Sequence, residues 1–273
     1  MLALAAPSMA GLPGVDLQFV VDLLLHYFVA SLRIGSFLIA APLFGARWLP
    51  LQIRIVLALS ITAVVAVQLP NIDTTVITSP VGVMMMLVEV GIGLSAGLVL
   101  TILFSAVMLS GEKIATAAGL GFAAQVDPQT GGQTPVVSQT LYLFLTVLFL
   151  SVDGHLVAIA TLMESYDILP IGAPVAPQVL IGAGINAAGM MFVAATIIML
   201  PIAMVLLMIN ISIGIITRSA PQLNLFSFGF PISLLAVFIL LYFSTAGFGS
   251  SMVQLIDDSL AVLQTMIMEM PRG

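Results

Sequence analysis

The chain has 273 residues, of which 61% are hydrophobic and 7% are charged. Soluble globular domains carry about 25% charged residues, so this composition is typical of a membrane protein. The formal net charge is −6 with only six lysines and arginines, which excludes a basic surface that neutralises several phosphates, and we expect no nucleic-acid partner. Cysteine is absent and there are two histidines, so we expect no disulfides, no metal and no other cofactor.

Composition along the chain predicts a single main domain. Prolines and glycines interrupt residues 1–15, which predicts a flexible N-terminal leader; cleavage of that leader is an open alternative. The apolar runs that follow leave no hydrophilic stretch long enough for a separate soluble domain, so we expect one helical domain over residues 16–250. Residues 251–273 carry several carboxylates and predict an acidic C-terminal tail.

Apolar segments near the length of a membrane-spanning helix, about 20 residues, predict an all-α fold of membrane-type helical hairpins. Six nominal spans are expected, at residues 17–44, 51–69, 81–110, 136–162, 179–217 and 231–248. The fifth would measure about 57 Å as one helix, against a hydrocarbon core of about 30 Å. Pro201 lies inside it, which predicts either a long kinked helix or a tight helical hairpin.

Small residues gather at residues 91–97 and again at residues 182–189. Small side chains let helices approach closely in a lipid environment, where the hydrophobic effect does not drive helices together. Two interpretations are open for these stretches: packing within the chain, and contacts with other subunits.

Charged residues inside apolar segments are the strongest signals in the sequence. A charge at the centre of a membrane costs at least about 2.5 kcal/mol, so such a side chain must face protein or water. For Arg33 we favour a structural ion pair or a side chain that reaches the segment end over an ion relay. Glu89 is expected to need a partner from another helix or chain, and Arg54 is assigned to the same group of buried polar or structural residues.

Asp153 and His155 interrupt a further apolar segment near its middle. We place them too among the buried polar or structural residues, where they satisfy a backbone break at Gly154. A proton pathway through the two side chains is the alternative. No arrangement of nucleophile, base and oxyanion donors and no phosphate-binding loop is recognisable, which argues against an enzyme.

Several motifs occur in one order along most of the chain. They are RIGSFLIAAPLFGARWLPLQIRI at 33–55, GLGFAAQVDP at 119–128, LFLSVDGHL at 148–156, LPIG at 169–172 and RSAPQLNLFSFGFP at 218–231. In this order they resemble the FliR family of the bacterial flagellar type III export apparatus, which is similar to the export-gate subunit of injectisomes.

This resemblance implies a component of a protein conduit, not an enzyme. The subunit would join FliP and FliQ in a helical export gate through which unfolded flagellar subunits leave the cytoplasm, with FlhB and the wider export apparatus as further partners. Its place would be in membrane lipid of the bacterial inner membrane, within the flagellar basal body. The alternatives are the injectisome homologue, and a small-solute or ion transporter that uses Glu89, Asp153 and His155.

The resemblance also implies a loop that plugs the closed pore, at Gly119, Leu120, Gly121, Phe122, Val126, Asp127 and Pro128. Phe122 and Val126 would fill space, the two glycines would give the backbone freedom, and Gln125 departs from the otherwise apolar stretch. From its mixture of residues, the stretch 218–231 predicts a contact with a neighbouring subunit, with packing inside this subunit as the alternative. The residues of that predicted interface are Arg218, Pro221, Phe226, Phe228 and Phe230.

Overall fold

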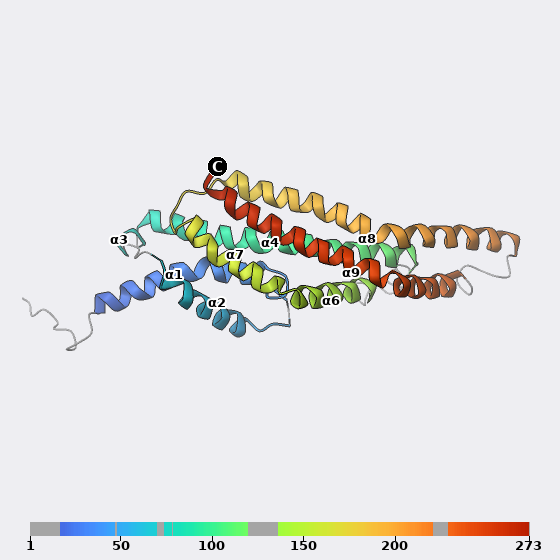
Figure 1. The fold of residues 1–273 in the computed structure, drawn as a ribbon, viewed down its shortest axis with the longest axis horizontal. Coiled ribbons are helices and arrows are strands. Elements are labelled where there is room, and N and C mark those ends of the chain that lie inside the picture. The colour runs from blue at the N-terminus through green and yellow to red at the C-terminus, as the bar shows by residue number, and fades with distance from the viewer. Residues whose placement is uncertain are drawn as a thin grey trace, which may run out of the picture. The chain divides into compact units, whose positions relative to one another are not determined.

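The structure is a computed structural model that describes residues 17–46, 48–69, 74–77, 79–119, 136–220 and 229–272. Every regular element in these ranges is a helix, so the predicted all-α class is confirmed, whereas assembly with other subunits stays a prediction. The helices, shown in Figure 1, are α1 (Leu17–Ala40), α2 (Leu51–Ala66), α3 (Thr74–Ile77), α4 (Pro80–Ala117), α6 (Val136–Ser151), α7 (Gly154–Ile168), α8 (Pro177–Ser219), α9 (Phe230–Glu269) and the short 3-10 helix η3 (Met270–Arg272).

The number of helices able to cross a membrane is smaller than the sequence suggested. Four helices of the described residues, α1, α4, α8 and α9, are long and apolar enough, and α6 with α7 forms a fifth candidate that is bent by 65°. The expected span at 51–69 yields only the 16-residue α2, about 24 Å of helix and too short for the hydrocarbon core. The six expected spans are therefore corrected to four or five.

Helix α8 decides between the two alternatives for residues 179–217. It runs without interruption for 43 residues and contains Pro201. The hairpin alternative is therefore wrong, and the segment is one helix of about 64 Å. Such a helix is about twice as long as the hydrocarbon core is thick.

The chain divides into two compact units. One comprises the residues up to Gly97 with Leu162–Val175, and the other comprises Leu98–Thr161 with the residues from Ala176 onwards. Helices α4 and α7 each contribute residues to both units. The predicted boundary after residue 250 falls inside α9, and the expected division into leader, gate domain and tail stays a prediction.

In the first unit, α1 packs along α2 and presents a buried face that includes Val29, Ile34 and Phe37. Glycines of α4 lie directly against α1. A Cβ atom added to Gly97 would lie only 2.7 Å from the Cβ of Ala40, and one added to Gly93 would collide with the Arg33 carbonyl oxygen. For these two glycines, packing within the chain is the correct interpretation.

In the second unit, α8 and α9 lie side by side and α6 packs along α9 (Figure 1). The ring of Phe104 in α4 meets the ring of Phe149 in α6 edge-on, with centroids 5.0 Å apart. In contrast to Gly93 and Gly97, the glycines of α8 at 182, 184 and 189 have no atom of the described residues within 4 Å of an added Cβ.

Candidate functional site

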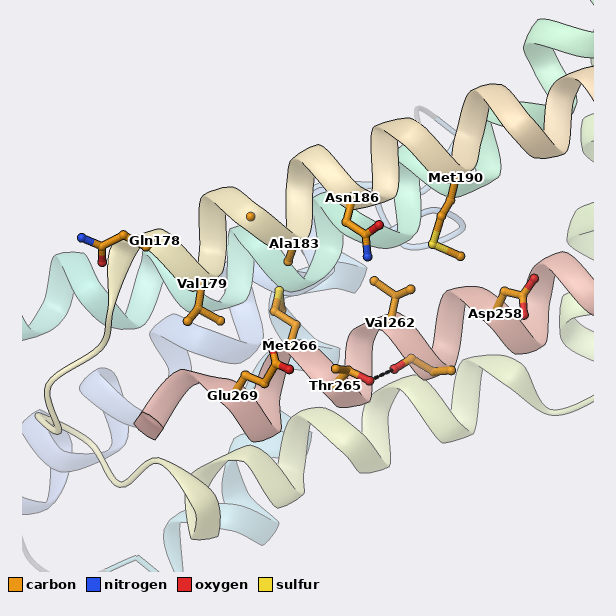
Figure 2. A pocket seen from close by; sticks show the side chains of 12 residues that line it. Gln178, Val179, Ala183, Asn186, Met190, Asp258, Val262, Thr265, Met266 and Glu269 are labelled. Carbon is orange, nitrogen blue, oxygen red and sulfur yellow. Dashed lines mark hydrogen bonds between the residues drawn. The ribbon is translucent and has the colours of Figure 1, made fainter. Parts of the chain in front are cut away.

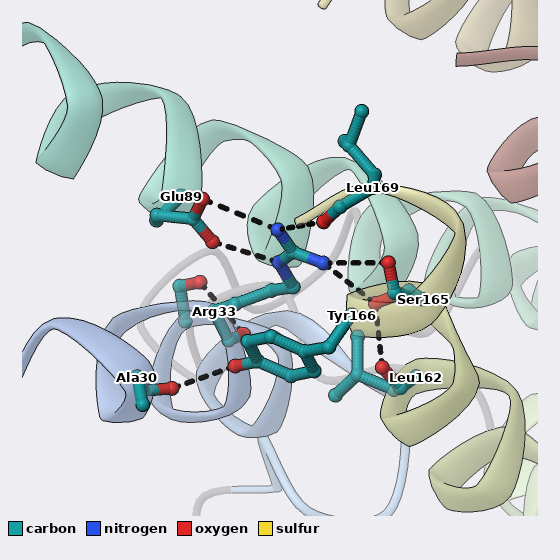
Figure 3. A network of polar contacts seen from close by, with 8 residues as sticks. Ala30, Arg33, Glu89, Leu162, Ser165, Tyr166 and Leu169 are labelled. Atoms are coloured by element: carbon teal, nitrogen blue, oxygen red, sulfur yellow. Dashed lines mark hydrogen bonds and ion pairs between the residues drawn. The ribbon is translucent and has the colours of Figure 1, made fainter. Parts of the chain in front are cut away.

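Arg33 of α1 lies at the centre of a polar network within the first unit (Figure 3). Its side chain is 0% exposed and that of its partner Glu89, in α4, is 1% exposed. Arg33 Nε donates to Glu89 Oε2 at 2.8 Å and Nη2 donates to Oε1 at 3.2 Å. The contact is therefore a two-pronged ion pair, which is the geometry that a planar guanidinium and a carboxylate favour.

The remaining donors of Arg33 are also satisfied. Nη1 donates to the carbonyl oxygen of Ser165 at 3.0 Å and to its Oγ at 2.9 Å, and Nη2 donates to the Leu169 carbonyl oxygen at 3.0 Å. A guanidinium has five N–H donors, and this network matches all of them. The ring of Tyr166 lies 4.2 Å from the guanidinium carbon, while its hydroxyl donates to the Ala30 carbonyl oxygen at 2.6 Å.

This network joins α1, α4 and α7 through contacts made inside the chain. Each carboxylate oxygen of Glu89 accepts one hydrogen bond from Arg33, and the side chain is 1% exposed, so Glu89 serves as the buried counter-ion of Arg33. The structure thus joins Arg33 and Glu89 in a buried ion pair that links α1 to α4. It gives no support to a transporter that uses Glu89.

The break between α6 and α7 is built around Asp153. Its φ of 56° lies in the left-handed region, which residues other than glycine, asparagine and aspartate rarely adopt. Its carbonyl oxygen accepts two N–H groups from the first turn of α7, those of Leu156 at 2.9 Å and Val157 at 3.1 Å. The Asp153 side chain is exposed, and its part at this break is in the backbone turn.

Gly154 and His155 have different tasks at this bend. A Cβ on Gly154 would lie 2.5 Å from the ring of Phe149, so the close approach of the two helices requires glycine. His155 is half-buried, with its ring centroid 6.4 Å from that of Phe149, and its Nδ1 has no hydrogen-bond partner among the described residues. No hydrogen bond or ion pair in the described ranges joins Asp153 to His155, which leaves the proton-pathway alternative without a connection.

Arg54 holds the turn that follows α1. Its Nη2 donates to the carbonyl oxygens of Ala46, at 2.5 Å, and Leu49, at 3.0 Å. Nearby, Leu43 has a φ of 64°. Arg54 is half-buried. It donates hydrogen bonds to backbone carbonyl oxygens of the turn and has no carboxylate partner in the described chain.

The predicted plug is described only at its first residue, since Leu120 to Pro128 lie outside the described residues. Gly119 has a φ of 82°, and its N–H donates to the Thr116 carbonyl oxygen at 3.0 Å. This is a glycine stop at the end of a helix, in which the missing Cβ permits the left-handed turn. The freedom of Gly119 is therefore used to end α4.

One residue beside this stop was missed by the sequence interpretation. Asn210 of α8 donates from Nδ2 to the Ala117 carbonyl oxygen at 2.9 Å, and its Oδ1 lies 3.2 Å from the Oγ of Ser233 in α9. The available signal was an amide inside a long segment with no charged residue before Arg218.

Little of the predicted interface at 218–231 falls within the described chain. Arg218 is exposed in the last turn of α8. Pro221, Phe226 and Phe228 lie outside the described residues, as does the side chain of Phe230. Contact with a neighbouring subunit therefore stays a prediction for this stretch.

A groove of about 500 Å³ runs between α8 and α9, and sequence analysis did not foresee it (Figure 2). Figure 2 shows Val179 and Asn186 of α8 on one side and Val262 of α9 on the other. Asp258 and Glu269 lie at the groove with exposed side chains. An open, shallow groove of mixed chemistry differs from the enclosed apolar pockets that hold small molecules.

The described residues form neither a nucleophile elbow nor a metal site. Gly93, Ser95 and Gly97 form a Gly-x-Ser-x-Gly sequence, but it lies inside α4 and not at the strand-to-helix turn that a nucleophile elbow requires. Among the described residues, no group of three or more His, Asp or Glu side chains is placed to hold a metal ion.

Comparison with known proteins identifies the family. The family model described as bacterial export proteins, family 1, matches residues 24–259. The chain belongs to the FliR family of bacterial export proteins. It is 37% identical to the flagellar biosynthetic protein FliR of Pectobacterium carotovorum over 210 residues, which cover 77% of this chain and 80% of that relative.

Other FliR relatives align over similar shares of both chains. The flagellar biosynthetic protein FliR of Escherichia coli is 32% identical, with 76% of this chain and 79% of that protein aligned. The protein of the same name from Aquifex aeolicus is also 32% identical, with coverages of 83% and 86%. FliR membership and the apolar helices make this chain a membrane-embedded component of flagellar export, and not an enzyme.

Proposed function

We propose that this chain is a subunit of the flagellar export gate, which forms with FliP and FliQ the channel for unfolded flagellar subunits. FlhB is a further partner, and the assembly lies in the bacterial inner membrane within the flagellar basal body. Membership of the FliR family is the observation that carries this proposal. The relatives named above are flagellar proteins, which favours a flagellar gate over the injectisome homologue.

Surface chemistry of α8 supports a role inside an assembly. Gly184 and Gly189 have no described atom within 4 Å of an added Cβ, which leaves room for a helix of another subunit to approach closely. Large apolar side chains that are more than half exposed continue along the same helix, at Ile181, Ile185, Phe192, Val193, Ile197, Leu200, Met204, Leu207, Met208, Ile211 and Ile215. At about 64 Å, α8 is too long for lipid to cover this whole surface, so part of it needs protein neighbours.

The experiment that tests the assembly is co-expression with FliP and FliQ followed by purification in mild detergent. The proposal expects the chain to leave a size-exclusion column together with both partners. An unrelated apolar membrane protein with a matching affinity tag is the control. A solitary chain or a small symmetric oligomer that excludes FliP and FliQ would contradict the gate and favour the transporter alternative.

The segment from Gly119 to Pro128 is the proposed plug of the closed channel. Its starting point is fixed by the glycine stop at the end of α4, so the segment leaves from a defined position. Deletion of residues 119–128 should make cells that express the gate permeable to small solutes. Unchanged permeability, at normal levels of the assembled complex, would count against a plug.

A further inference from the structure

The first half of α9 presents a row of large apolar side chains that are 47% to 78% exposed. They recur at positions i, i+3, i+4, i+7 and i+8, so they share one side of the helix. We refer to this surface as the aromatic stripe, and its members are Leu235, Phe238, Ile239, Tyr242 and Phe243. The buried residues of this half of the helix, Ser233, Val237 and Phe248, lie on the other side.

Two rings of the aromatic stripe support each other. Tyr242 and Phe243 are each 78% exposed, and their rings meet edge-on with centroids 5.5 Å apart. This is a favoured geometry for a pair of rings, and aromatic side chains lose little conformational entropy when they are covered. Exposed rings held in this way have the properties of the anchor residues found at the centres of protein interfaces.

Exposed apolar side chains fit lipid as well as protein, so the hydroxyl of Tyr242 is the informative group. Helix α9 carries no charged residue from Phe230 to Ile256, a stretch of about 40 Å that exceeds the hydrocarbon thickness of about 30 Å. Tyr242 lies about 18 Å along this stretch, near its middle and away from the membrane–water interface where tyrosine is enriched. Its hydroxyl makes no hydrogen bond with a described residue. Lipid tails offer no acceptor either, so a lipid-facing hydroxyl at this depth costs free energy.

Water is no better an environment for the same surface. If this part of α9 lay outside the lipid, the three rings of the aromatic stripe would present on the order of 400 Å² of apolar surface to water. A patch of this size on a water-exposed surface marks a contact site. A protein neighbour with a hydrogen-bond acceptor removes the cost in both environments.

We propose that the aromatic stripe of α9 docks an uncharged helix of another subunit of the gate, and that this helix offers an oxygen acceptor to the Tyr242 hydroxyl. The inference rests on the proposed function, which supplies the other subunits. The acceptor is a backbone carbonyl freed at a helix break, or the oxygen of a Ser, Thr, Asn or Gln side chain. Small residues of the partner leave room for the rings of Phe238 and Phe243. The partner is uncharged along this contact because the stripe holds no counter-ion for it.

The first experiment identifies what lies against the aromatic stripe in the assembled complex. Phe243→p-benzoylphenylalanine places a photo-crosslinking ring on the stripe with little change of shape. Irradiation of cells that express the gate is followed by purification and mass spectrometry of the linked peptides. We expect the linked peptide to come from an apolar helix of another subunit. A link to lipid alone, to a second copy of this chain or to no molecule overturns the inference.

Two further positions make this experiment decisive. Phe238→p-benzoylphenylalanine should capture the same helix, and it takes the place of the first variant if that variant does not assemble. Phe28→p-benzoylphenylalanine, on the exposed side of α1, is the control for capture by proximity in the membrane. Any product from position 28 should not respond to a change at Tyr242.

Tyr242→Phe tests the hydroxyl separately from the rings, because it removes only the oxygen. Co-expression with an equal amount of the unsubstituted chain makes the cross-linking yield from position 243 report relative affinity, since both chains compete for one partner. Loss of one hydrogen bond between helices should lower this yield about threefold. Tyr27→Phe removes a hydroxyl that donates to the Leu59 carbonyl oxygen inside the first unit, and it should leave the yield unchanged. An unchanged yield in Tyr242→Phe overturns the proposed acceptor.

The composition of the purified complex separates this inference from the proposed function. If the complex contains FliP and FliQ but position 243 links only to lipid, the gate stands and the docking surface fails. If FliP and FliQ are absent but position 243 links to a helix of another identified membrane protein, and Tyr242→Phe lowers that yield, the docking surface stands and the proposed function fails.

Discussion

At the scale of single residues, the pairing of Arg33 with Glu89 shows how a membrane-class chain accommodates charge. Both side chains are almost fully buried, so each has lost its hydration, and the two-pronged contact with its additional acceptors replaces it. Gly93 contributes to the same site, because only a residue without a Cβ lets α4 approach the Arg33 carbonyl oxygen. Arg33 and Gly93, which are far apart in the sequence, thus both belong to the contact between α1 and α4.

Breaking this ion pair from one side should cost more than removing it. We expect Glu89→Ala to lower the stability of the folded chain by about 3–5 kcal/mol, because Arg33 would stay buried without its counter-ion. The double variant Arg33→Met with Glu89→Leu should recover most of that loss. Thermal unfolding of the purified complex measures the difference, with the exposed Lys113→Gln in α4 as control. A double variant no more stable than Glu89→Ala would contradict this account.

At the scale of elements, the bend between α6 and α7 depends on a backbone conformation and not on a proline. Asp153 turns the chain at a φ of 56°, and the helix axes differ by 65°. The close contact of Gly154 with the ring of Phe149 then fixes how α7 begins. The sequence predicted a break here, since two polar residues and a glycine interrupt an apolar run, but not that the aspartate would be exposed.

The loss of stability on substituting Asp153 should depend on its backbone angle and not on its charge. Asp153→Gly should be tolerated, because glycine adopts the left-handed region readily. Asp153→Val should destabilise the chain by about 1–3 kcal/mol, because a β-branched side chain is strained there. Comparing the melting temperatures of the two variants in the purified complex tests this. Equal loss in both variants would instead assign the effect to the carboxylate.

The C-terminal half of α9 could be recognised from residue spacing but not from composition. Residues 251–273 were predicted to be an acidic tail, a division that stays a prediction, and within this range the helix continues to Glu269. The buried residues of this half recur at helical spacing, at Met252, Leu255, Ile256, Ser259, Leu263, Met266 and Ile267. That period of three and four residues was readable from the sequence and outweighs a few surface carboxylates.

At the scale of the whole molecule, the glycines of α4 and α8 differ in whether another part of the chain packs against them. Those of α4 at 93 and 97 are used in contacts within the first unit, while those of α8 at 184 and 189 have no described atom close to an added Cβ. The glycines of α8 match the proposal that other subunits complete the surface of this chain. A monomer that was complete by itself would gain helix stability by replacing these glycines with alanine.

A bulky residue at Gly184 should therefore affect assembly and not folding. We expect Gly184→Leu to lower the amount of FliP and FliQ that co-purifies about tenfold, since overpacking of an interface costs about 1–3 kcal/mol. Because a Cβ added at Gly184 meets no described atom within 4 Å, the yield of folded subunit should stay unchanged. Ile185→Leu, at the neighbouring exposed position, is the volume-matched control. Normal co-purification of Gly184→Leu would argue that this face contacts lipid.

The sequence by itself determined the helical membrane class, the need to shelter Arg33 and Glu89, and the break before Gly154. These follow from the costs of charge and of interrupted helices in apolar surroundings, which each segment carries locally. Only the tertiary structure decided that Arg33 meets Glu89, 56 residues away, and that Asn210 reaches Ala117 and Ser233. Helical periodicity shows which face of a helix is apolar but not which other helix it meets, and these contacts depend on that choice.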